Sequence, residues 1–332
     1  MRRALLAAAL GMVATAAAQT YVNPVIEPVA ADPSVIRAED GTWYLYATQD
    51  RWDDGLERYL PIFRSRDLVS WEHVGEVFAL PPSWKSSGFL WAPDVSVVEG
   101  VYHLYYSYST WGDPNPCIGL ARAPSPGGPW EDLGRPVFCS EDIGVRNSID
   151  PFHHVAEDGT RTLVWGSFHG IYAVTLSADG TAPAGEPVRL ADTRFEAAYV
   201  IERDGYYYLI LSSGSCCEGA SSTYATWVGR SESLLGPYVD DLGRNLRSGG
   251  GRIVLYRNDA WVGPGHAAVA TDDAGDDWLV YHAVDPEQPL LRYGATRRPV
   301  LIDRIEWVDG WPVVNGDEGP SSQERPAPVV GE

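Results

Sequence analysis

The chain contains five segments that follow one pattern, and this repeat restricts its fold more than any other feature does. Each segment opens with a large polar or aromatic residue and reaches a glycine nine positions later. The opening residues and their glycines are Asp32 and Gly41, Trp91 and Gly100, Asp150 and Gly159, Glu196 and Gly205, and His266 and Gly275. A repeat of this kind indicates an architecture that is built from similar units.

Each unit predicts a β-hairpin. Its glycine usually follows an acidic residue, which suits a tight turn, and a run rich in aromatic and β-branched residues comes next. The distance between units leaves room for about two more short strands, and the first unit shows them at 61–65 and 71–78. The sequence therefore predicts an all-β fold, a five-bladed β-propeller. Two packed sandwiches, in which hairpins also recur, are the alternative.

Composition excludes several other classes of protein. The 332 residues include 34 Gly and 25 Pro and show no long run of helix-forming residues at helical spacing, which disfavours coiled coils and helical bundles. The formal charge of −20 comes from 25 basic and 45 acidic residues. Because phosphate contacts need clustered Lys and Arg, no nucleic-acid partner is expected.

The first residues predict export from the cytoplasm. Arg2 and Arg3 precede an apolar stretch that ends in small residues, which is typical of a secretory signal peptide, residues 1–18, cleaved after Ala18. The mature protein is then expected to be secreted or periplasmic. No later segment is apolar for long enough to span a bilayer, so no membrane association is expected after cleavage.

The remaining chain divides into one domain and a tail. The propeller is expected to occupy residues 19–315, and the segment 316–332, rich in Pro, Ser, Gly and acidic residues, is expected to be disordered. A closed ring of blades leaves little strand edge to pair with another chain, so a monomer is expected.

Four cysteines allow three disulfide pairings. Export permits disulfides, and a bridge between Cys117 and Cys139 is the expected one. The adjacent Cys216 and Cys217 would be strained if bridged to each other. They also make a poor zinc site, since no His or further Cys stands at ligand spacing.

The propeller interpretation brings the five opening residues together, because the innermost strand of each blade lines the central channel. Three carboxylates, one imidazole and one indole would then face one cavity. Crowded carboxylates repel each other, so one should hold a proton near neutrality beside another that is ionised. Glycoside hydrolysis uses such a pair, an acid for the leaving oxygen and a base for water. The indole of Trp91 offers an apolar face for a sugar ring.

Each of these residues also has an ordinary structural interpretation. An Asp before Pro, as at Asp32 and Asp150, most often forms a turn, and a single Trp or His most often belongs to the core. However, all five residues stand nine positions before a repeat glycine, and this shared position favours a functional role for the set over separate structural roles. Asp94 does not stand at this offset, and it is expected to have a structural hydrogen-bonding role. His266 could be a general base, a metal ligand or a channel-lining residue.

Several motifs resemble those of glycoside hydrolase family 43. They are Asp32-Pro33-Ser34, Trp91-Ala92-Pro93-Asp94, Asn147-Ser148-Ile149-Asp150-Pro151 and Arg194-Phe195-Glu196. Within this family, Cys216-Cys217-Glu218-Gly219, Ser222-Thr223-Tyr224 and Gly263-Pro264-Gly265-His266 are similar to motifs of the endo-1,5-α-L-arabinanases. The resemblance covers nearly all of the chain after the signal peptide.

The resemblance implies a five-bladed propeller that cuts α-1,5-linked arabinan or arabino-oligosaccharides with inversion. Asp32 would be the general base, Glu196 the general acid, and Asp150 the group that raises the pKa of that acid. Trp91, Trp111 and Ser148 would bind the sugar. His266 would hold a hydrated calcium ion, or a similar cation, in the central channel.

The chain also departs from the resemblance. Ala31, Ala197-Ala198 and Ala267-Ala268 stand where relatives often carry His, Gly or Pro, and Asn. These differences leave an exo-acting relative open: an arabinofuranosidase, an exo-arabinanase or a β-xylosidase. A carbohydrate-binding propeller without activity is a further alternative, although a lectin needs no matched acid and base.

Overall fold

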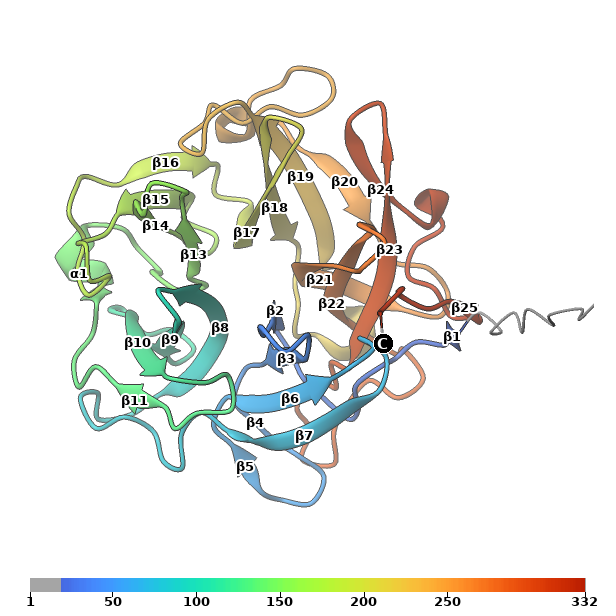
Figure 1. Ribbon diagram of the computed structural model, residues 1–332, viewed down its shortest axis with the longest axis horizontal. Coiled ribbons are helices and arrows are strands. Elements are labelled where there is room, and N and C mark those ends of the chain that lie inside the picture. Colours follow the sequence, from blue (N-terminus) through green and yellow to red (C-terminus); the bar gives the residue numbers. More distant parts are fainter. Residues whose placement is uncertain (1–18, 332) are drawn as a thin grey trace, which may run out of the picture.

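The protein is a five-bladed β-propeller. The computed structural model describes residues 19–331, and in this range five antiparallel sheets of four or more strands surround a common centre (Figure 1). Only short helices occur among these residues. The predicted all-β propeller is confirmed, and the alternative of two packed sandwiches is not observed.

Each blade is formed by consecutive strands. Blade 1 contains β2 (Ser34–Arg37), β3 (Trp43–Tyr46), β6 (Pro61–Ser65) and β7 (Trp71–Glu76). Blade 2 contains β8 (Phe89–Val98), β9 (Val101–Ser109), β10 (Cys117–Ala123), β11 (Glu131–Asp132) and β12 (Phe138–Cys139). Blade 3 contains β13 (Phe152–Val155), β14 (Arg161–Trp165), β15 (Ile171–Thr175) and β16 (Val188–Ala191).

The last two blades follow the same plan. Blade 4 contains β17 (Phe195–Arg203), β18 (Tyr206–Ser213), β19 (Ala225–Ser231) and β20 (Arg252–Leu255). Blade 5 contains β21 (Val262–Thr271), β22 (Asp277–Val284), β23 (Val300–Val308) and β24 (Trp311–Val314). The small elements are β1 (Thr20–Tyr21), β4 (Asp50–Arg51), β5 (Glu57–Arg58), α1 (Ser140–Ile143), η1 (Gly219–Ser221), η2 (Leu246–Ser248), η3 (Asn315–Asp317) and β25 (Arg325–Pro326).

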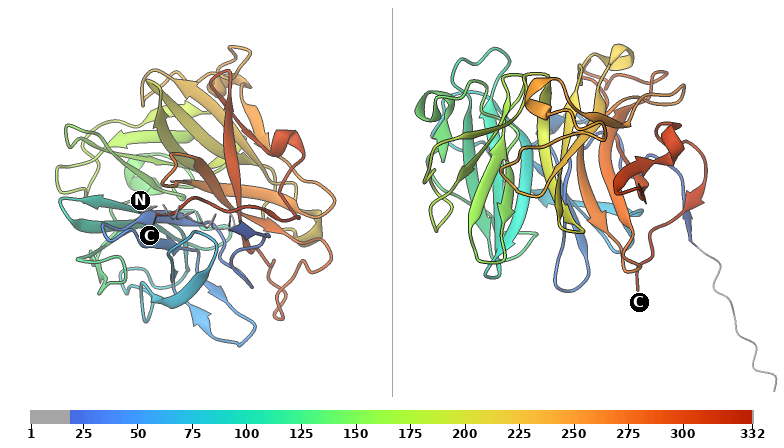
Figure 2. Two further views of the ribbon diagram at one scale, coloured as in Figure 1. Left: turned by 45° about the vertical axis from the view of Figure 1, so that its right-hand side comes forward. Right: turned by 90° about the horizontal axis from the view of Figure 1, so that it is seen from above.

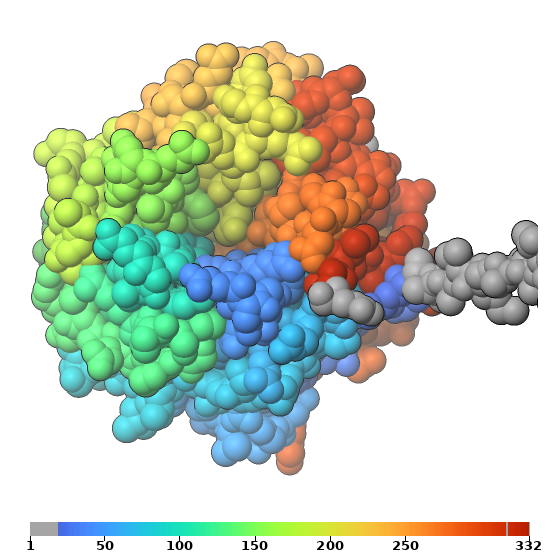
Figure 3. Space-filling model, in the orientation of Figure 1, coloured from blue at the N-terminus to red at the C-terminus, as the bar shows by residue number. Residues whose placement is uncertain are grey.

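The first strand of every blade is the innermost strand. Strands β2, β8, β13, β17 and β21 contact one another in that order, and β21 returns to β2, which closes the ring (Figure 1). In the side view the blades stand next to one another with their strands in the same general direction (Figure 2). The colours in the space-filling view pass around the molecule in sequence order (Figure 3).

Hydrophobic cores lie between neighbouring blades. Leu45 of β3 and Val280 of β22 belong to the core between blades 1 and 5, and Val164 of β14 and Leu209 of β18 to the core between blades 3 and 4. Phe195 in the latter core is fully buried. Burial of one such side chain stabilises the fold by about 1.5–3 kcal/mol.

The turns agree with the repeat in the sequence. Each repeat glycine has a positive φ in the turn between the first and second strands of its blade, with values of 82° at Gly41, 77° at Gly100, 83° at Gly159, 79° at Gly205 and 81° at Gly275. Glycine adopts this left-handed conformation at no steric cost, which explains why it recurs there.

The expectation of a disordered tail is wrong for the part of 316–332 that the structure describes. Arg325–Pro326 forms β25, which pairs antiparallel with β1, and the Val329 N–H donates to the Asp272 carboxylate at 2.8 Å. Composition predicted disorder, but backbone pairing with β1 and buried contacts at Ser321 hold the segment on the propeller. The predicted signal peptide, residues 1–18, lies outside the described residues.

One disulfide joins two strands of blade 2, and the other joins adjacent residues in the loop between β18 and β19. Cys117 on β10 is bonded to Cys139 on β12, which confirms the expected pair. Cys216 is bonded to Cys217, although the strain expected between adjacent cysteines argued against this bridge. None of the helices within residues 19–331 is long and apolar enough to cross a membrane.

Candidate active site

The five opening residues of the repeat line one pocket. The cavity has a volume of about 600 Å³, and each blade in turn contributes one lining residue: Asp32, Trp91, Asp150, Glu196 and His266. The pocket lies where the chain enters the innermost strands, at the end away from the hairpin turns. The sequence repeat therefore located the pocket.

Backbone geometry directs these residues into the pocket. Asp32, Asp150 and His266 adopt positive φ values of 56°, 58° and 49°, whereas in the other two blades the left-handed residue is the next one, Ala92 at 45° and Ala197 at 57°. The pairing register of both blades shifts at this point. The shared offset thus holds to within one residue.

In all five blades the backbone N–H of the left-handed residue bonds to a side chain of the preceding blade, and four of these bonds share one pattern. The acceptors stand seven positions after the repeat glycine: Thr48 accepts from Ala92, Ser107 from Asp150, Ser212 from His266, and His282 from Asp32, at 2.8–3.1 Å. Each bond satisfies a backbone donor and joins two blades. Non-glycine residues in this conformation cost about 1–2 kcal/mol each, which such contacts offset.

Blade 3 differs, and the difference involves the candidate catalytic carboxyls. Gly166 stands at the position of the acceptor, so no side chain reaches Ala197 from there. The Ala197 N–H donates instead to Oδ2 of Asp150 at 3.2 Å. The next residue, Ser167, donates its hydroxyl to Oε2 of Glu196 at 2.7 Å. Asp150 is therefore tied to the residue that follows Glu196.

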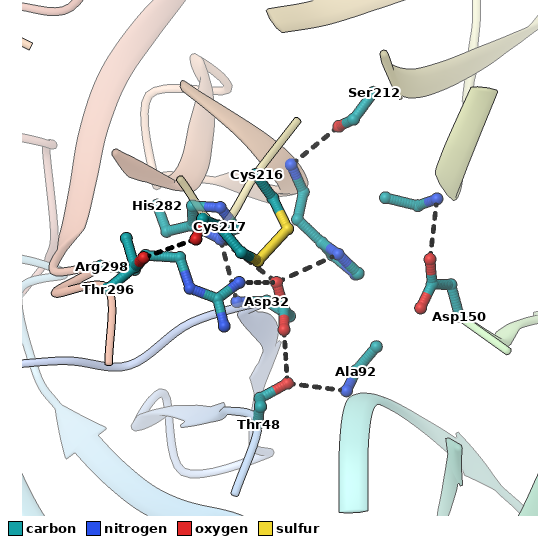
Figure 4. Close-up of polar contacts among 12 residues, drawn as sticks. Asp32, Thr48, Ala92, Asp150, Ser212, Cys216, Cys217, His282, Thr296 and Arg298 are labelled. Carbon is teal, nitrogen blue, oxygen red and sulfur yellow. Dashed lines mark hydrogen bonds and ion pairs between the residues drawn. A yellow bond between two sulfur atoms is a disulfide. The ribbon is translucent and has the colours of Figure 1, made fainter. Parts of the chain in front are cut away.

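The Asp32 carboxylate is held in its ionised form. Its Oδ1 lies 3.0 Å from Nη1 of Arg298 and 3.3 Å from Nδ1 of His266, and its Oδ2 accepts from the Thr48 hydroxyl at 2.5 Å (Figure 4). Burial alone would raise the pKa of Asp32, but Arg298 and then the two histidines and Thr48 more than offset this effect. The pKa of Asp32 consequently lies below its usual range.

The pKa values of the other two carboxyls are raised. Burial raises the pKa of Glu196 to about 7, against the lowering effect of hydrogen bonds from Ser167 and Tyr224. Burial, and then the charges of Glu196 and Asp32, raise the pKa of Asp150 well above its ordinary value. The pocket thus contains an ionised carboxylate beside two carboxyls whose raised pKa values favour the protonated form, which is the division that acid–base catalysis needs.

Aromatic side chains form another part of the pocket. The rings of Trp91 and Trp111 lie 5.6 Å apart at 48°, and Phe89 stacks on Trp91 at 6.2 Å. The side chain of Trp111 is 75% exposed, which is unusual for so large an apolar group. These indoles offer apolar faces for sugar rings.

The structure places Ser148 away from the pocket, and its predicted substrate contact is wrong. Its side chain is fully buried, donates to the Val145 carbonyl oxygen at 2.9 Å and accepts from Nε1 of Trp165 at 3.1 Å. Its neighbours Asn147 and Ile149 line the pocket instead.

Asp94 also lies outside the pocket lining, in agreement with its expected structural role. It accepts from the Ser34 hydroxyl at 3.2 Å and from the His153 N–H at 2.8 Å. These bonds connect blades 1, 2 and 3 beneath the pocket.

His266 is a suitable ligand for a largely hydrated cation. No group of three or more His, Cys, Asp and Glu side chains gathers to hold a metal within residues 19–331, so a resident ion would take most of its coordination from water. Burial lowers the pKa of His266, so its imidazole is neutral, as a ligand must be. Calcium readily keeps waters in its shell, and the carboxyls of the pocket favour a cation.

Sequence reasoning missed several residues of the site. They are Thr48, Ser167, Tyr224, His282 and Arg298. A second reading of the repeat, seven positions after each glycine, would have found Thr48 and His282. Arg298 lies in an irregular loop between β22 and β23 where no repeat applies, so the sequence carried no signal for its pairing with Asp32.

Comparisons with known proteins identify relatives across the whole propeller. The extracellular endo-alpha-(1->5)-L-arabinanase 1 of Bacillus subtilis is 35% identical over 324 residues, covering 93% of this chain and 95% of the relative. The extracellular exo-alpha-(1->5)-L-arabinofuranosidase ArbA of Cellvibrio japonicus is 33% identical, covering 86% of both chains.

A solved structure shares the fold. The Cellvibrio cellulosa alpha-L-arabinanase complexed with arabinohexaose superposes with a TM-score of 0.76 at 32% identity, covering 87% of this chain and 96% of that one. The sequence model of the glycosyl hydrolases family 43 matches residues 21–312. This match spans all five blades and every carboxyl of the pocket, and the chain belongs to glycosyl hydrolase family 43.

Proposed function

We propose that this protein hydrolyses internal bonds of α-1,5-linked L-arabinan and inverts the configuration at the anomeric carbon of the sugar at the cleaved bond. The observation that carries the proposal is the sharing of one pocket by Asp32, Asp150 and Glu196 with pKa values shifted in opposite directions. A binding protein without activity would need no such separation of acid and base.

Asp32 acts as the general base. It takes a proton from a water molecule, whose oxygen attacks the anomeric carbon from the face away from the leaving group. Arg298, His266 and Thr48 contact both oxygens of this carboxylate and fix its orientation. Inversion needs room for that water, so roughly 6.5–9.5 Å should separate base and acid when substrate is bound.

Glu196 acts as the general acid. Its raised pKa keeps the proton available near neutral pH, and that proton passes to the glycosidic oxygen as the bond to the anomeric carbon breaks. The Ser167 hydroxyl orients the carboxyl. The Asp150 carboxyl accepts a hydrogen bond from the N–H of Ala197, the residue after Glu196. When Asp150 is ionised, its negative charge opposes the ionisation of Glu196.

Arabinan is the proposed substrate because of the pocket and the relatives together. Trp91 and Trp111 provide stacking faces, and the pocket carries no group of basic residues for an anionic sugar beyond Arg146 and Arg298. The relatives named above act on α-1,5-linked arabinose chains according to their names.

His266 would hold the hydrated cation of this site. When bound, the ion would supply positive charge that favours the ionised form of nearby carboxyls. Export through the predicted signal peptide, residues 1–18, is part of the proposal, in keeping with two relatives that are named as extracellular. We also propose that the protein acts as a monomer.

Exo cleavage is the second candidate. The Cellvibrio japonicus relative, whose name describes exo action, is 33% identical to this chain, and the Bacillus subtilis relative, whose name describes endo action, is 35% identical. An exo enzyme would release one product length from the start of the reaction, whereas internal cleavage gives a ladder of lengths and a rapid fall in viscosity.

A product profile tests the proposal. Purified protein is incubated with debranched arabinan, and chain lengths and viscosity are followed over time, with Glu196→Gln as the inactive control. Mixed oligosaccharides with early loss of viscosity support internal cleavage, and a single short product supports the second candidate. Intact arabinan after incubation with the wild type would contradict both.

A further inference from the structure

The disulfide between Cys216 and Cys217 lies in the pocket lining and has no part in the acid–base step described above. Five consecutive residues, 214–218, line the cavity on the loop between β18 and β19 of blade 4. Both cysteines are half-buried. Adjacent half-cystines close a small ring through the peptide group between them. The Cβ–S–S–Cβ edge of this ring is apolar and polarisable and carries no hydrogen-bond donor.

Hydrogen bonds on both sides hold this ring in place. The Ser215 carbonyl oxygen accepts from the Ser222 hydroxyl and from the N–H groups of Thr223 and Tyr224, at 2.6–3.1 Å. On the other side, the Thr296 hydroxyl donates to the Cys217 carbonyl oxygen at 2.8 Å and accepts from the Gly219 N–H at 3.2 Å (Figure 4). The loop is therefore ordered before any ligand binds, which lowers the entropic cost of binding.

These anchors connect the disulfide to both halves of the catalytic pair. Thr296 lies two residues before Arg298, which contacts Asp32, and the disulfide lines the same pocket as Arg298 and Asp32. Tyr224, whose N–H holds the loop, lines the pocket and affects the pKa of Glu196 through its hydroxyl. A sugar ring positioned between Asp32 and Glu196 is thus bounded by this loop.

We propose that the Cys216–Cys217 disulfide is a specificity-determining wall of the pocket, on which an arabinofuranose ring of the substrate rests. It supplies the apolar surface on blade 4, while Trp91 and Trp111 supply that on blade 2. This inference rests on the proposed function and names a contact for its substrate. Because the contact exists before and during bond cleavage, its loss raises KM and leaves kcat nearly unchanged.

The test compares two double variants with the wild type. Cys216→Ala/Cys217→Ala removes the wall, and Cys117→Ala/Cys139→Ala is the matched control, because it removes a disulfide that lies outside the pocket lining. KM and kcat are measured on linear arabino-oligosaccharides, together with Tm and the pH dependence of kcat/KM. We expect KM to rise about three- to tenfold in the first variant only, with kcat within about twofold.

A chemical version of the test uses the control variant, in which only the adjacent disulfide remains. A dithiol reductant converts Cys216 and Cys217 to thiols and is itself oxidised to a cyclic disulfide. Reduction should raise KM as the alanine variant does, and reoxidation should restore it. Such recovery would not follow from a folding defect.

Two results would overturn the inference. One is an unchanged KM in both the alanine variant and the reduced protein while the wild type cleaves arabinan, and this would leave the proposed function intact. The other is a fall in kcat and Tm together with a displaced pH profile, which would show that the disulfide only supports the fold. A wild type that leaves arabinan intact would overturn the proposed function and this inference with it.

Discussion

The guanidinium of Arg298 lies 3.0 Å from Oδ1 of Asp32, and it is the first of the groups that keep this buried carboxylate ionised. Without it, the effect of burial on Asp32 would be opposed only by the histidines and Thr48. The two residues are 266 positions apart and meet where blade 5 returns to blade 1.

Replacement of Arg298 should therefore shift the acidic limb of the pH profile. In Arg298→Gln the pKa of Asp32 rises, so more of the base is protonated at low pH. We expect kcat/KM to fall more at pH 5 than at pH 7, by about tenfold for each unit by which the pKa of Asp32 comes to exceed the assay pH. Rates on arabino-oligosaccharides across this range check the prediction.

Arg297→Gln is the matched control for this experiment. Arg297 is the neighbouring residue, but it pairs with Glu27 and does not line the pocket. Equal losses at both pH values in Arg298→Gln, or the same shift in the control, would contradict the role of Arg298.

The alkaline limb should report Glu196. Its pKa of about 7 means that the general acid loses its proton as the pH rises through neutrality, so kcat/KM should fall there. Glu196→Gln removes the proton donor and should lower kcat by about 10²–10⁴-fold on arabinan. A substrate with a nitrophenyl leaving group needs less protonation and should be affected less. A wild-type rate that stays level well above pH 8 would contradict this assignment.

The same variant should be more stable than the wild type at high pH. The folded-state pKa of Glu196 is raised, so its neutral form stabilises the fold at low pH and this contribution is lost as the pH rises through about 7. Gln stays neutral, so the gain in free energy of unfolding should reach about 3 kcal/mol at pH 8 and be small at pH 5. Thermal unfolding at both pH values measures it, and a larger gain at pH 5 would refute it.

Ser107 should contribute to stability through the site backbone. Its fully buried hydroxyl accepts from the Asp150 N–H at 2.9 Å, and Ser107→Ala leaves that donor without its partner. We expect a loss of about 1–3 kcal/mol in the free energy of unfolding. Ser248→Ala on the exposed η2 is the control and should be close to neutral in denaturant titrations.

The cation at His266 gives a further prediction. Chelator treatment should lower kcat/KM, and added calcium should restore it; His266→Ala should show neither effect. Bound metal, measured by mass spectrometry of the desalted protein, should be absent from that variant. A metal-free wild type with full activity would contradict the proposal.

Local patterns predicted the fold and most of the site. The turn glycines, such as Gly41 and Gly205, require a conformation that few other residues adopt, so they mark every blade in the sequence. Asp32, Asp150 and Glu196 could be placed from the same offset because the propeller repeats its geometry around one axis.

Other features depend on contacts between distant parts of the chain. Arg298 reaches Asp32 from a loop where the repeat has no defined position. Ser148 belongs to the right segment, but its side chain faces the interior, and the sequence of this irregular segment does not show which side chains face the pocket. The tail was misjudged because composition does not reveal a pairing with β1.

The pairing of β1 with β25 has a practical consequence. Thr20 lies opposite Pro326, so the two ends of the described propeller are adjacent at the seam between its first and last blades (Figure 1). A short peptide could join them covalently, and the chain could be reopened in the exposed turn at Gly243 to give a circular permutant with the same blades in a new order.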